Sequence, residues 1–411
     1  MRKIAPVLIF AVLLAGLIYL LRPDLFGQER EPRKSGRLLE VAQGQPLAKL
    51  PAAAPGQTAK SAVVLIGDGL GFAGIEASRL LNRGIGGSLQ LDRFPVAGFS
   101  TTRSAIDVVT DSAAGATAIA TGHKTLNRQL AVDAQGNRLR TLAEAAKAQG
   151  KAVGLITDSY MWDATPGGFA VHQANRRKYL EIAAELAGQD FDVLIGCEAN
   201  RVKEDDDDQG PVVQKFRAAG YGVGRDLDWL AAAGPGKVLA LLPAGAITPQ
   251  EGASQLPRAV ALALARLAAA PNGYLLMIES EETDSGGHDN ILDQVTRGVE
   301  ALDGSLAAVF AAAEADRQTL VVWTADHETG GLAILGGKAG KPLEYLFTTE
   351  GHNAEPVPLL AYGPGAELFG GRHDNTDVGR GLAQALGLDL GFAPVPAPTV
   401  PPAAAPPSAA P

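Results

Sequence analysis

The sequence is poor in cysteine and histidine, and both shortages narrow its chemistry. Its single cysteine, Cys197, has no partner for an intrachain disulfide. Zinc ribbons and iron–sulfur clusters need several thiolates and are excluded. A metal ion would therefore have to be held by carboxylates and by the six histidines. The chain also lacks a basic excess, because its net charge is −9, which argues against a nucleic-acid partner.

A long apolar run lies at the amino end, where residues 4–21 follow Met1-Arg2-Lys3 without a charge. A run of this length can just cross the hydrocarbon core of a bilayer, which is about 30 Å thick. The exit Tyr19-Leu20-Leu21-Arg22 lacks a small-x-small cleavage site, so residues 1–21 are predicted to be a signal anchor. We expect a membrane-anchored body facing the periplasm or exterior, or a secreted one if the segment is cleaved. Basic residues on both flanks leave the orientation open on charge alone.

Two further segments differ in composition from the body of the chain. Residues 22–58 are rich in Arg, Glu, Pro, Gln and Gly, which predicts a polar stalk or linker. Residues 391–411 are almost entirely Ala, Pro and Val, which predicts a disordered tail. The remaining residues, 59–390, are therefore expected to form one domain.

The body alternates between short apolar runs and longer amphipathic or Ala-rich segments. The predicted strands are Ser61–Ile66, Ala152–Ile156, Asp192–Ile195, Tyr274–Ile278, Leu320–Trp323 and Val357–Ala361. The predicted helices are Thr141–Gln149, Arg176–Ala187, Pro257–Ala269, Ile291–Ala313 and Asp377–Ala385. This alternation predicts a doubly wound α/β fold, with a largely parallel central sheet and helices on both faces. The pattern weakens over residues 197–255, which we interpret as an inserted cap, with Asp205–Asp208 as a solvated loop rather than a calcium site.

Polar clusters follow almost every predicted strand, at the edge where ligands bind in such sheets. The candidate residues are Asp68, Ser112, Asp163, Thr165, Arg176, Glu279, Asp284, His288, Asp326, His327 and His352. Hard oxygen ligands such as Asp163 and Thr165 suit Mg²⁺, and Arg176 could clamp an oxyanion. His172, one helical turn before Arg176, is interpreted as support rather than as a ligand.

Taken singly, two of these clusters also fit simpler roles. The glycines Gly69, Gly71 and Gly74 fit a dinucleotide-binding pattern, but Asp68 at the strand end would repel a pyrophosphate unless a metal lay between them. Ser112 and its preceding Asp could be an ordinary helix cap. The group of Glu279, Asp284 and His288 is more specific, because a surface loop does not account for a carboxylate that ends a buried strand.

Taken in chain order from about Val63 to Leu388, these motifs resemble the alkaline phosphatase family. The resemblance implies that Ser112, in Asp-Ser-Ala-Ala, is the phosphorylated nucleophile and that Arg176 grips the phosphate. The implied metal ligands are Asp284, His288 and His352 for a first zinc, Asp326 and His327 for a second, Asp68 between the second zinc and a magnesium, and Thr165 and Glu279 for that magnesium with Asp163 beside it. Ser285 stands where well-known members carry Lys or His.

The resemblance predicts hydrolysis of small phosphate monoesters at a site with two zinc ions and one magnesium ion. A phosphodiesterase or another hydrolase of the same superfamily is the nearest alternative. A membrane-tethered phosphate-binding pseudoenzyme is the alternative from another class. The family is commonly dimeric, so the resemblance also allows a homodimer.

Overall fold

The computed structural model of the protein describes residues 30–198 and 210–391. The expected membrane segment at residues 4–21, the acidic run Asp205–Asp208 and the tail at residues 392–411 lie outside these ranges. In the described part of the chain, no helix is both long and apolar enough to cross a bilayer.

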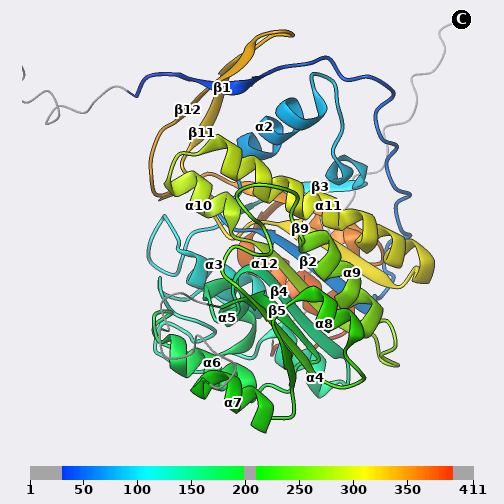
Figure 1. The fold of residues 1–411 in the computed structure, drawn as a ribbon. Helices are drawn as coiled ribbons and strands as arrows, with labels where there is room; N and C mark the ends of the chain where they lie inside the picture. The colour runs from blue at the N-terminus through cyan, green and yellow to red at the C-terminus, as the bar shows by residue number, and fades with distance from the viewer. Residues whose placement is uncertain (1–29, 199–209, 392–411) are drawn as a thin grey trace, which may run out of the picture.

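A ten-stranded sheet forms the centre of the molecule (Figure 1). Its inner strands are apolar runs such as Ser61–Gly67, which is buried along its whole length. In spatial order the strands are β15 (Gly371–Asp374), β3 (Val96–Thr101), β14 (Val357–Tyr362), β9 (Thr319–Thr324), β2 (Ser61–Gly67), β8 (Tyr274–Ser280), β4 (Ala152–Tyr160), β5 (Val193–Cys197), β7 (Val238–Leu242) and β6 (Gly222–Gly224). β14 runs antiparallel to β3 and β9, and the other ladders of this sheet are parallel. The predicted, largely parallel sheet is confirmed.

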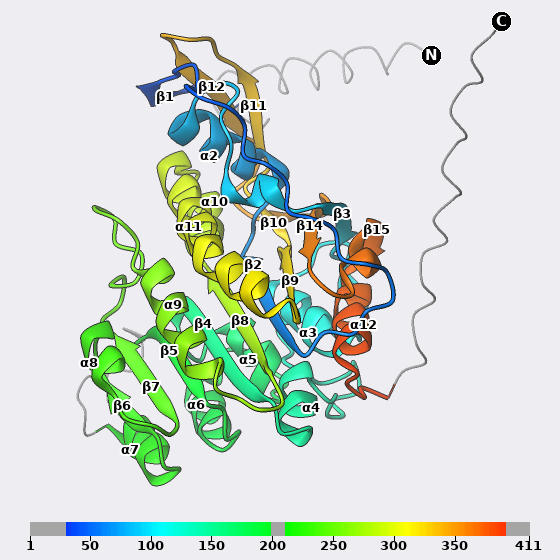
Figure 2. The ribbon, with the colours of Figure 1, turned by 90° about the vertical axis from the view of Figure 1, so that its right-hand side faces the viewer.

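Helices cover both faces of the sheet, as Figure 2 shows edge-on. Successive residues of β2 enter different cores, with Val64 and Ile66 in one and Val63 and Leu65 in the other. The first core also takes residues from α3 (Ser112–Thr121), α4 (Leu142–Ala148), α5 (Ala164–Ala170), α6 (Tyr179–Ala187), α7 (Pro211–Ala218) and α12 (Asn375–Leu386). The second takes residues from α8 (Leu227–Ala232), α9 (Leu256–Leu267), α11 (Leu292–Asp316) and the 3-10 helix η2 (Gln90–Arg93). A second 3-10 helix, η3, spans Ala366–Phe369.

A smaller layer lies beyond the carboxyl edge of the main sheet. Its antiparallel strands are β1 (Arg33–Leu38), β12 (Pro342–Phe347) and β11 (Leu332–Gly336). They pack with α2 (Phe72–Arg83) around Tyr345 and Phe347. Two short strands, β10 (Glu328–Thr329) and β13 (His352–Asn353), pair nearby.

This layer differs from the predicted linker over residues 22–58. Of the described part, residues 33–38 form β1, and Leu39 and Leu50 are buried. The strand is joined to β12 mainly through its backbone, and most of its side chains are exposed. Composition therefore gave no signal for it.

The predicted cap over residues 197–255 also needs correction. Its described part contains β6 and β7, which extend the main sheet, and α7 and α8, which cover it. The stretch looked irregular in sequence because β6 has only three residues and α8 only six. This part of the chain completes the sheet.

Candidate active site

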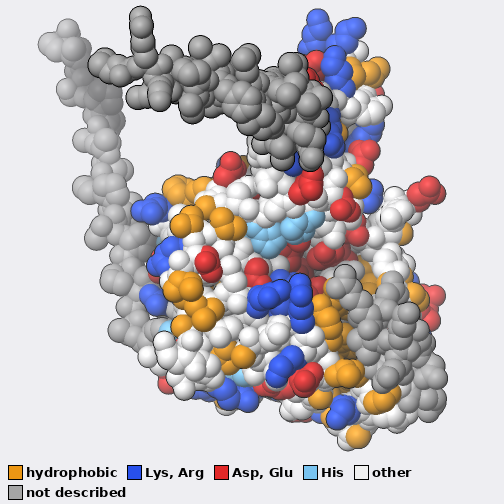
Figure 3. All heavy atoms as spheres, turned by 90° about the vertical axis from the view of Figure 1, so that its left-hand side faces the viewer, with side chains coloured by type: hydrophobic (Ala, Val, Ile, Leu, Met, Phe, Trp, Pro, Cys, Tyr) orange, Lys and Arg blue, Asp and Glu red, His pale blue; other side chains and the backbone are white. Residues whose placement is uncertain are grey.

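The candidate residues gather where parallel strands of the main sheet end. Asp68 follows β2, Glu279 lies near the end of β8, and Asp326 and His327 follow β9. α10 (Glu282–His288) begins just after β8 and carries Asp284 and His288. Figure 3 shows this face, with histidines at the surface beside a hollow lined by acidic side chains. Residues spread over almost 300 positions of the chain thus meet at one edge, as the strand-end argument predicts.

Ser112 is the first residue of α3, and its side chain faces this cluster. Asp111 caps the helix by accepting a hydrogen bond from the Ala114 N–H at 3.0 Å. Ser112 is only 2% exposed, and its Oγ lies 3.2 Å from Nε2 of His327. A hydroxyl at a helix N-terminus, beside an imidazole, is well placed to act as a nucleophile toward an anionic ester.

Arg176 approaches Ser112 from the other side. Its Nη1 donates to Ser112 Oγ at 3.1 Å, and its Nη2 donates to Asp163 at 3.2 Å. Asp111 lies 3.5 Å from the same guanidinium. Burial opposes its charge, but Asp163 and Asp111 raise the pKa of Arg176 above its ordinary value. The guanidinium stays cationic and is held in a fixed orientation.

One group of possible metal ligands lies beside the nucleophile. Asp68, Asp326 and His327 bring their ligand atoms within 4.8 Å of one another, and all three residues are buried. His327 Nε2 lies 3.4 Å from Asp68 Oδ1 and 3.4 Å from Asp326 Oδ2. Burial, together with the repulsion of neighbouring carboxylates, raises the pKa of Asp68 and raises that of Asp326 to about 7. Ionised carboxylates that are buried this close together repel one another, and a bound cation would offset that repulsion.

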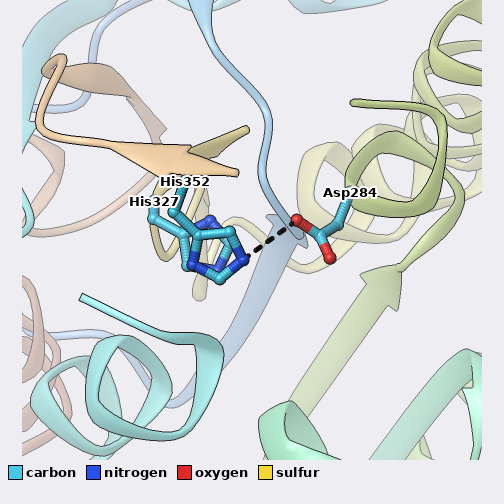
Figure 4. A group of neighbouring side chains, drawn as sticks. All are labelled: Asp284, His327 and His352. Atoms are coloured by element: carbon cyan, nitrogen blue, oxygen red, sulfur yellow. Dashed lines mark ion pairs between the residues drawn. The ribbon is translucent and has the colours of Figure 1, made fainter. Parts of the chain in front are cut away.

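A second group lies around Asp284. Asp284, His327 and His352 also place ligand atoms within 4.8 Å, and Figure 4 shows both rings beside the carboxylate. The two rings stack at 3.7 Å between centroids, and His352 Nε2 lies 3.6 Å from Asp284. His288 joins from the surface, with Nε2 at 3.4 Å from Asp284 and 3.1 Å from His352 Nε2. The geometry thus brings together the three predicted ligands of the first zinc and places His327 next to both groups.

Thr329 fixes the tautomer of His327. Its hydroxyl donates to the Asp284 carboxylate, and its oxygen lies 3.2 Å from His327 Nδ1. Because the hydroxyl has one proton, Nδ1 must donate to that oxygen. Nε2 then presents its lone pair toward Asp68, Asp326 and Ser112, which is the arrangement that a metal ligand needs.

The predicted magnesium ligands lie on the far side of Asp68. Thr165 donates to Asp68 Oδ2 at 3.4 Å, and Asp163 caps the same helix α5. Burial and the nearby Asp163 carboxylate raise the pKa of Glu279 to about 8, against hydrogen bonds from threonines. Hydroxyl and carboxylate oxygens of this kind suit Mg²⁺.

Unsatisfied oxygens test whether metals fit here. Within the described residues, Asp68 Oδ1, Asp326 Oδ2 and Glu279 Oε2 are buried without a hydrogen-bond partner. Buried carboxylate oxygens rarely lack partners. Asp68 Oδ1 and Asp326 Oδ2 belong to the ligand set predicted for the second zinc, and Glu279 Oε2 belongs to the set predicted for the magnesium. The donor set therefore fits divalent cations.

Sequence reasoning missed several residues that support the site. Asp158, at the end of β4, accepts hydrogen bonds from Thr248, Ser280 and the Glu281 backbone at 2.7 to 2.8 Å. It thereby holds the segment that follows Glu279. Glu281 in turn accepts from Ser285 at 2.7 Å. The Asp following an apolar run was the available signal for Asp158, but its partners lie far away in sequence.

His172 is placed as its supporting interpretation predicts. Its Nδ1 lies 3.1 Å from Glu185, and its Nε2 lies 2.9 Å from the Leu139 carbonyl and 3.4 Å from Glu144. These contacts tie the segment leading to Arg176 to α4 and α6. His172 belongs to neither group of candidate metal ligands.

Comparisons with known proteins identify the family of this chain. The alkaline phosphatase family profile matches residues 59–198 and 248–345, more than half of the chain. Alkaline phosphatase 3 of Bacillus subtilis is 28% identical over 80% of this chain and 89% of its own length. Streptomycin-6-phosphate phosphatase of Streptomyces griseus is 32% identical over 80% of this chain and 91% of its own length.

Solved structures show the same fold. A variant of alkaline phosphatase from the Antarctic bacterium TAB5, with magnesium bound in its M3 site, superposes with a TM-score of 0.73. It is 27% identical and covers 81% of this chain and 99% of its own. With family profile, relatives and fold in agreement, this chain belongs to the alkaline phosphatase family and is a phosphatase.

Proposed function

We propose that the protein hydrolyses phosphate monoesters in two steps through a phosphorylated Ser112, at a site for two zinc ions and one magnesium ion. The observation that carries the proposal is the position of Ser112 Oγ, 3.2 Å from His327 Nε2 and 3.1 Å from Arg176. His327 would supply a ligand for a cation beside the hydroxyl, and Arg176 supplies a positive charge for the phosphate.

The proposed ligand sets are Asp284, His288 and His352 for the first zinc, Asp68, Asp326 and His327 for the second, and Asp68, Thr165 and Glu279 for the magnesium. Bound zinc would lower the pKa of coordinated hydroxyls and stabilise the leaving oxygen. Asp163 stands beside the magnesium ligands and is hydrogen-bonded to Arg176 at 3.2 Å. It therefore couples the magnesium set to the phosphate-binding arginine.

In the first step, a bond forms between Ser112 Oγ and phosphorus as the bond to the ester oxygen breaks, and the proton of the Ser112 hydroxyl passes through water to the departing alcohol. Arg176 pairs with the equatorial phosphate oxygens, whose charge the free N–H groups of α3 also face. The guanidinium of Arg176 is already oriented by Asp163 and Asp111, so it loses little conformational freedom when it binds the phosphate. In the second step, water attacks the phosphorus, the bond between phosphorus and Ser112 Oγ breaks, and Oγ takes up a proton from that water as inorganic phosphate is released.

The test is a variant that lacks the nucleophile. Ser112→Ala is expected to lose phosphomonoesterase activity by about three orders of magnitude or more, because no other hydroxyl is bonded to both His327 and Arg176 in the described chain. The variant should still bind zinc, as measured by native mass spectrometry. Wild-type enzyme quenched in acid should carry a phosphate on Ser112. Activity retained by the variant would refute the assignment, and faster hydrolysis of a diester than of a monoester would favour a phosphodiesterase.

The location of the enzyme and its oligomeric state remain predictions from the sequence. We propose that residues 4–21 anchor it outside the cytoplasmic membrane, where phosphate esters that cross membranes poorly are accessible. Protease accessibility in intact spheroplasts tests that proposal, since a protected body would contradict it. A homodimer is proposed from the family alone, and sedimentation tests it.

A further inference from the structure

Arg128 has a backbone conformation that its side chain disfavours. Its φ is +74°, in the left-handed region. Asp and Asn tolerate this region, but a long side chain there costs free energy that glycine would not. Among the described residues, the arginines with positive φ are Arg128 and Arg317. Strain of this kind is retained at functional sites when the side chain contributes something in return.

The backbone of Arg128 joins the nucleophile to the phosphate-binding arginine. Its N–H donates to both carboxylate oxygens of Asp111, at 3.0 and 3.1 Å. Its carbonyl accepts from the Arg176 N–H at 2.8 Å. Asp111 caps the helix that Ser112 begins. Glycine could make all these backbone contacts without strain, so they do not explain why an arginine stands here.

The side chain of Arg128 is exposed, and it has no ion-pair or hydrogen-bond partner within residues 30–198 and 210–391. Arg177 and Lys178, which follow Arg176, are exposed as well. Figure 3 shows Lys and Arg side chains close to the surface histidines of the site. Because its backbone contacts Asp111 and Arg176, Arg128 lies at the rim of the site, and its positive charge has no partner among the described residues.

The chemistry of the reaction places the leaving group toward this rim. In phosphoryl transfer the leaving oxygen lies opposite the attacking one. Ser112 is buried, with 2% exposed, so the alcohol part of the ester must point from the phosphorus toward the open side of the site. An exposed guanidinium there can pair with a carboxylate or phosphate carried by that alcohol.

We propose that Arg128 is a specificity-determining residue that binds a second negative charge on the leaving group. The preferred substrates are then phosphate monoesters whose alcohol part carries a carboxylate or another phosphate. This inference rests on the proposed phosphomonoesterase function.

Two esters that differ in this charge test the proposal. 3-Phosphoglycerate carries a carboxylate where glycerol 3-phosphate carries a hydroxymethyl group, and both are esters of primary alcohols. The readout is the ratio of their kcat/KM values, measured at low and high salt. In wild type the ratio should favour 3-phosphoglycerate and should fall as salt screens the charge. In Arg128→Gly the ratio should fall on the order of five-fold, and Arg128→Lys should keep most of it.

Thermal unfolding separates this role from a structural one. Arg128→Gly should melt no lower than wild type, because strain is removed while the backbone contacts remain. Arg317→Gly is the matched control: Arg317 has φ +52°, is exposed, and caps α11 before β9 begins, at the end of the sheet away from the site. Like Arg128→Gly, Arg317→Gly should melt no lower than wild type. It should leave the ratio of the two kcat/KM values at the wild-type value.

The outcomes are distinguishable. If Arg128→Gly slows both esters equally, Arg128 acts only through Arg176, and the proposal fails. If the ratio does not change, Arg128 is an ordinary solvated arginine, and the proposal again fails. If wild type hydrolyses neither ester nor any other monoester, the proposed function itself is wrong.

Discussion

His172 and His327 are both buried beside two carboxylates, but they differ in their hydrogen-bond partners and in the direction in which their pKa is shifted. Both ring nitrogens of His172 contact an oxygen, from Glu185, Leu139 or Glu144, within 2.9 to 3.4 Å. Burial opposes its charge, but Glu144 and Glu185 outweigh that effect and raise the pKa of His172 to about 9. Around His327, burial and the neighbouring His352 lower the imidazole pKa far below its ordinary value. Nearby, Asp68 and Asp326 each keep a buried oxygen that has no hydrogen-bond partner among residues 30–198 and 210–391.

The difference separates a structural cluster from a binding site. A protonated His172, together with Arg138, which pairs with both Glu144 and Glu185, supplies the positive charge that the two carboxylates need, so the cluster is complete without a ligand. A neutral His327 supplies none, so Asp68 and Asp326 need charge from outside the chain. Histidine and acidic residues thus stabilise the fold around His172, whereas around His327 the same residue types form a site that is suited to binding a cation.

The largest expected effect comes from removing metals. Chelation should lower activity by about three orders of magnitude or more and should also destabilise the fold at alkaline pH. Burial raises the pKa of Asp326 to about 7 and that of Glu279 to about 8 without a cation. A raised pKa gives stability that is present below the unfolded value, near 4, and is lost as pH rises through 7 and 8.

Calorimetry checks this prediction. The melting temperature of the chelated protein should fall between pH 5 and pH 9 by more than that of the zinc- and magnesium-loaded protein. Adding metal back should restore the difference at pH 9. A chelated protein as stable as the loaded one at pH 9 would remove the distinction between the two clusters.

A smaller effect is expected at His172. Its pKa is raised from 6.5 to about 9, so its stabilisation is complete below pH 6.5 and is lost as pH rises through 9. His172→Gln keeps hydrogen-bonding groups but removes the charge. It should cost on the order of 2–3 kcal/mol of unfolding free energy near pH 6 and little above pH 10, with metal present. Denaturant unfolding at several pH values measures this.

His373→Gln is the matched control, because it changes a histidine in edge strand β15 that contacts a backbone carbonyl. It should leave the pH dependence of stability as in wild type. An equal cost of His172→Gln at pH 6 and pH 10 would show that the charge of His172 does not matter.

Much of this comparison could be foreseen from local sequence. Apolar runs that end in Asp68, Glu279 and Asp326 identified both the strands and the edge where the site lies. Ser112 was recognisable from its Asp-Ser-Ala-Ala context. These features depend on neighbours in sequence, which a strand or a helix start arranges in a fixed way.

Other features depend on contacts between distant segments and left no local signal. His327 was assigned to one metal with Asp326, but the structure stacks its ring on His352, 25 positions away, so it stands beside both groups. β1 pairs with a strand about 300 residues later and has mostly polar side chains. No sequence pattern marks Arg128, because its strained φ is visible only in the folded backbone.

The smallest effect is expected at Thr329, which lies between the two metal groups without belonging to either. Its hydroxyl donates to Asp284 and accepts from His327 Nδ1 at 3.2 Å, so it orients a ligand of each group. Thr329→Val keeps the shape and removes both hydrogen bonds. We expect zinc affinity to fall roughly ten-fold, the low end for the loss of such a supporting contact, with kcat at saturating zinc changed less. Competition with a chelator of known affinity measures this.

Thr121→Val is the control, because Thr121 is a buried threonine whose hydroxyl donates to a backbone carbonyl within α3. If both variants bind zinc as wild type does, the tautomer of His327 is not set by Thr329. In that case the lone pair of Nε2 is directed by the metal itself, and the His327 cluster depends on its cation more completely than the hydrogen bonds indicate.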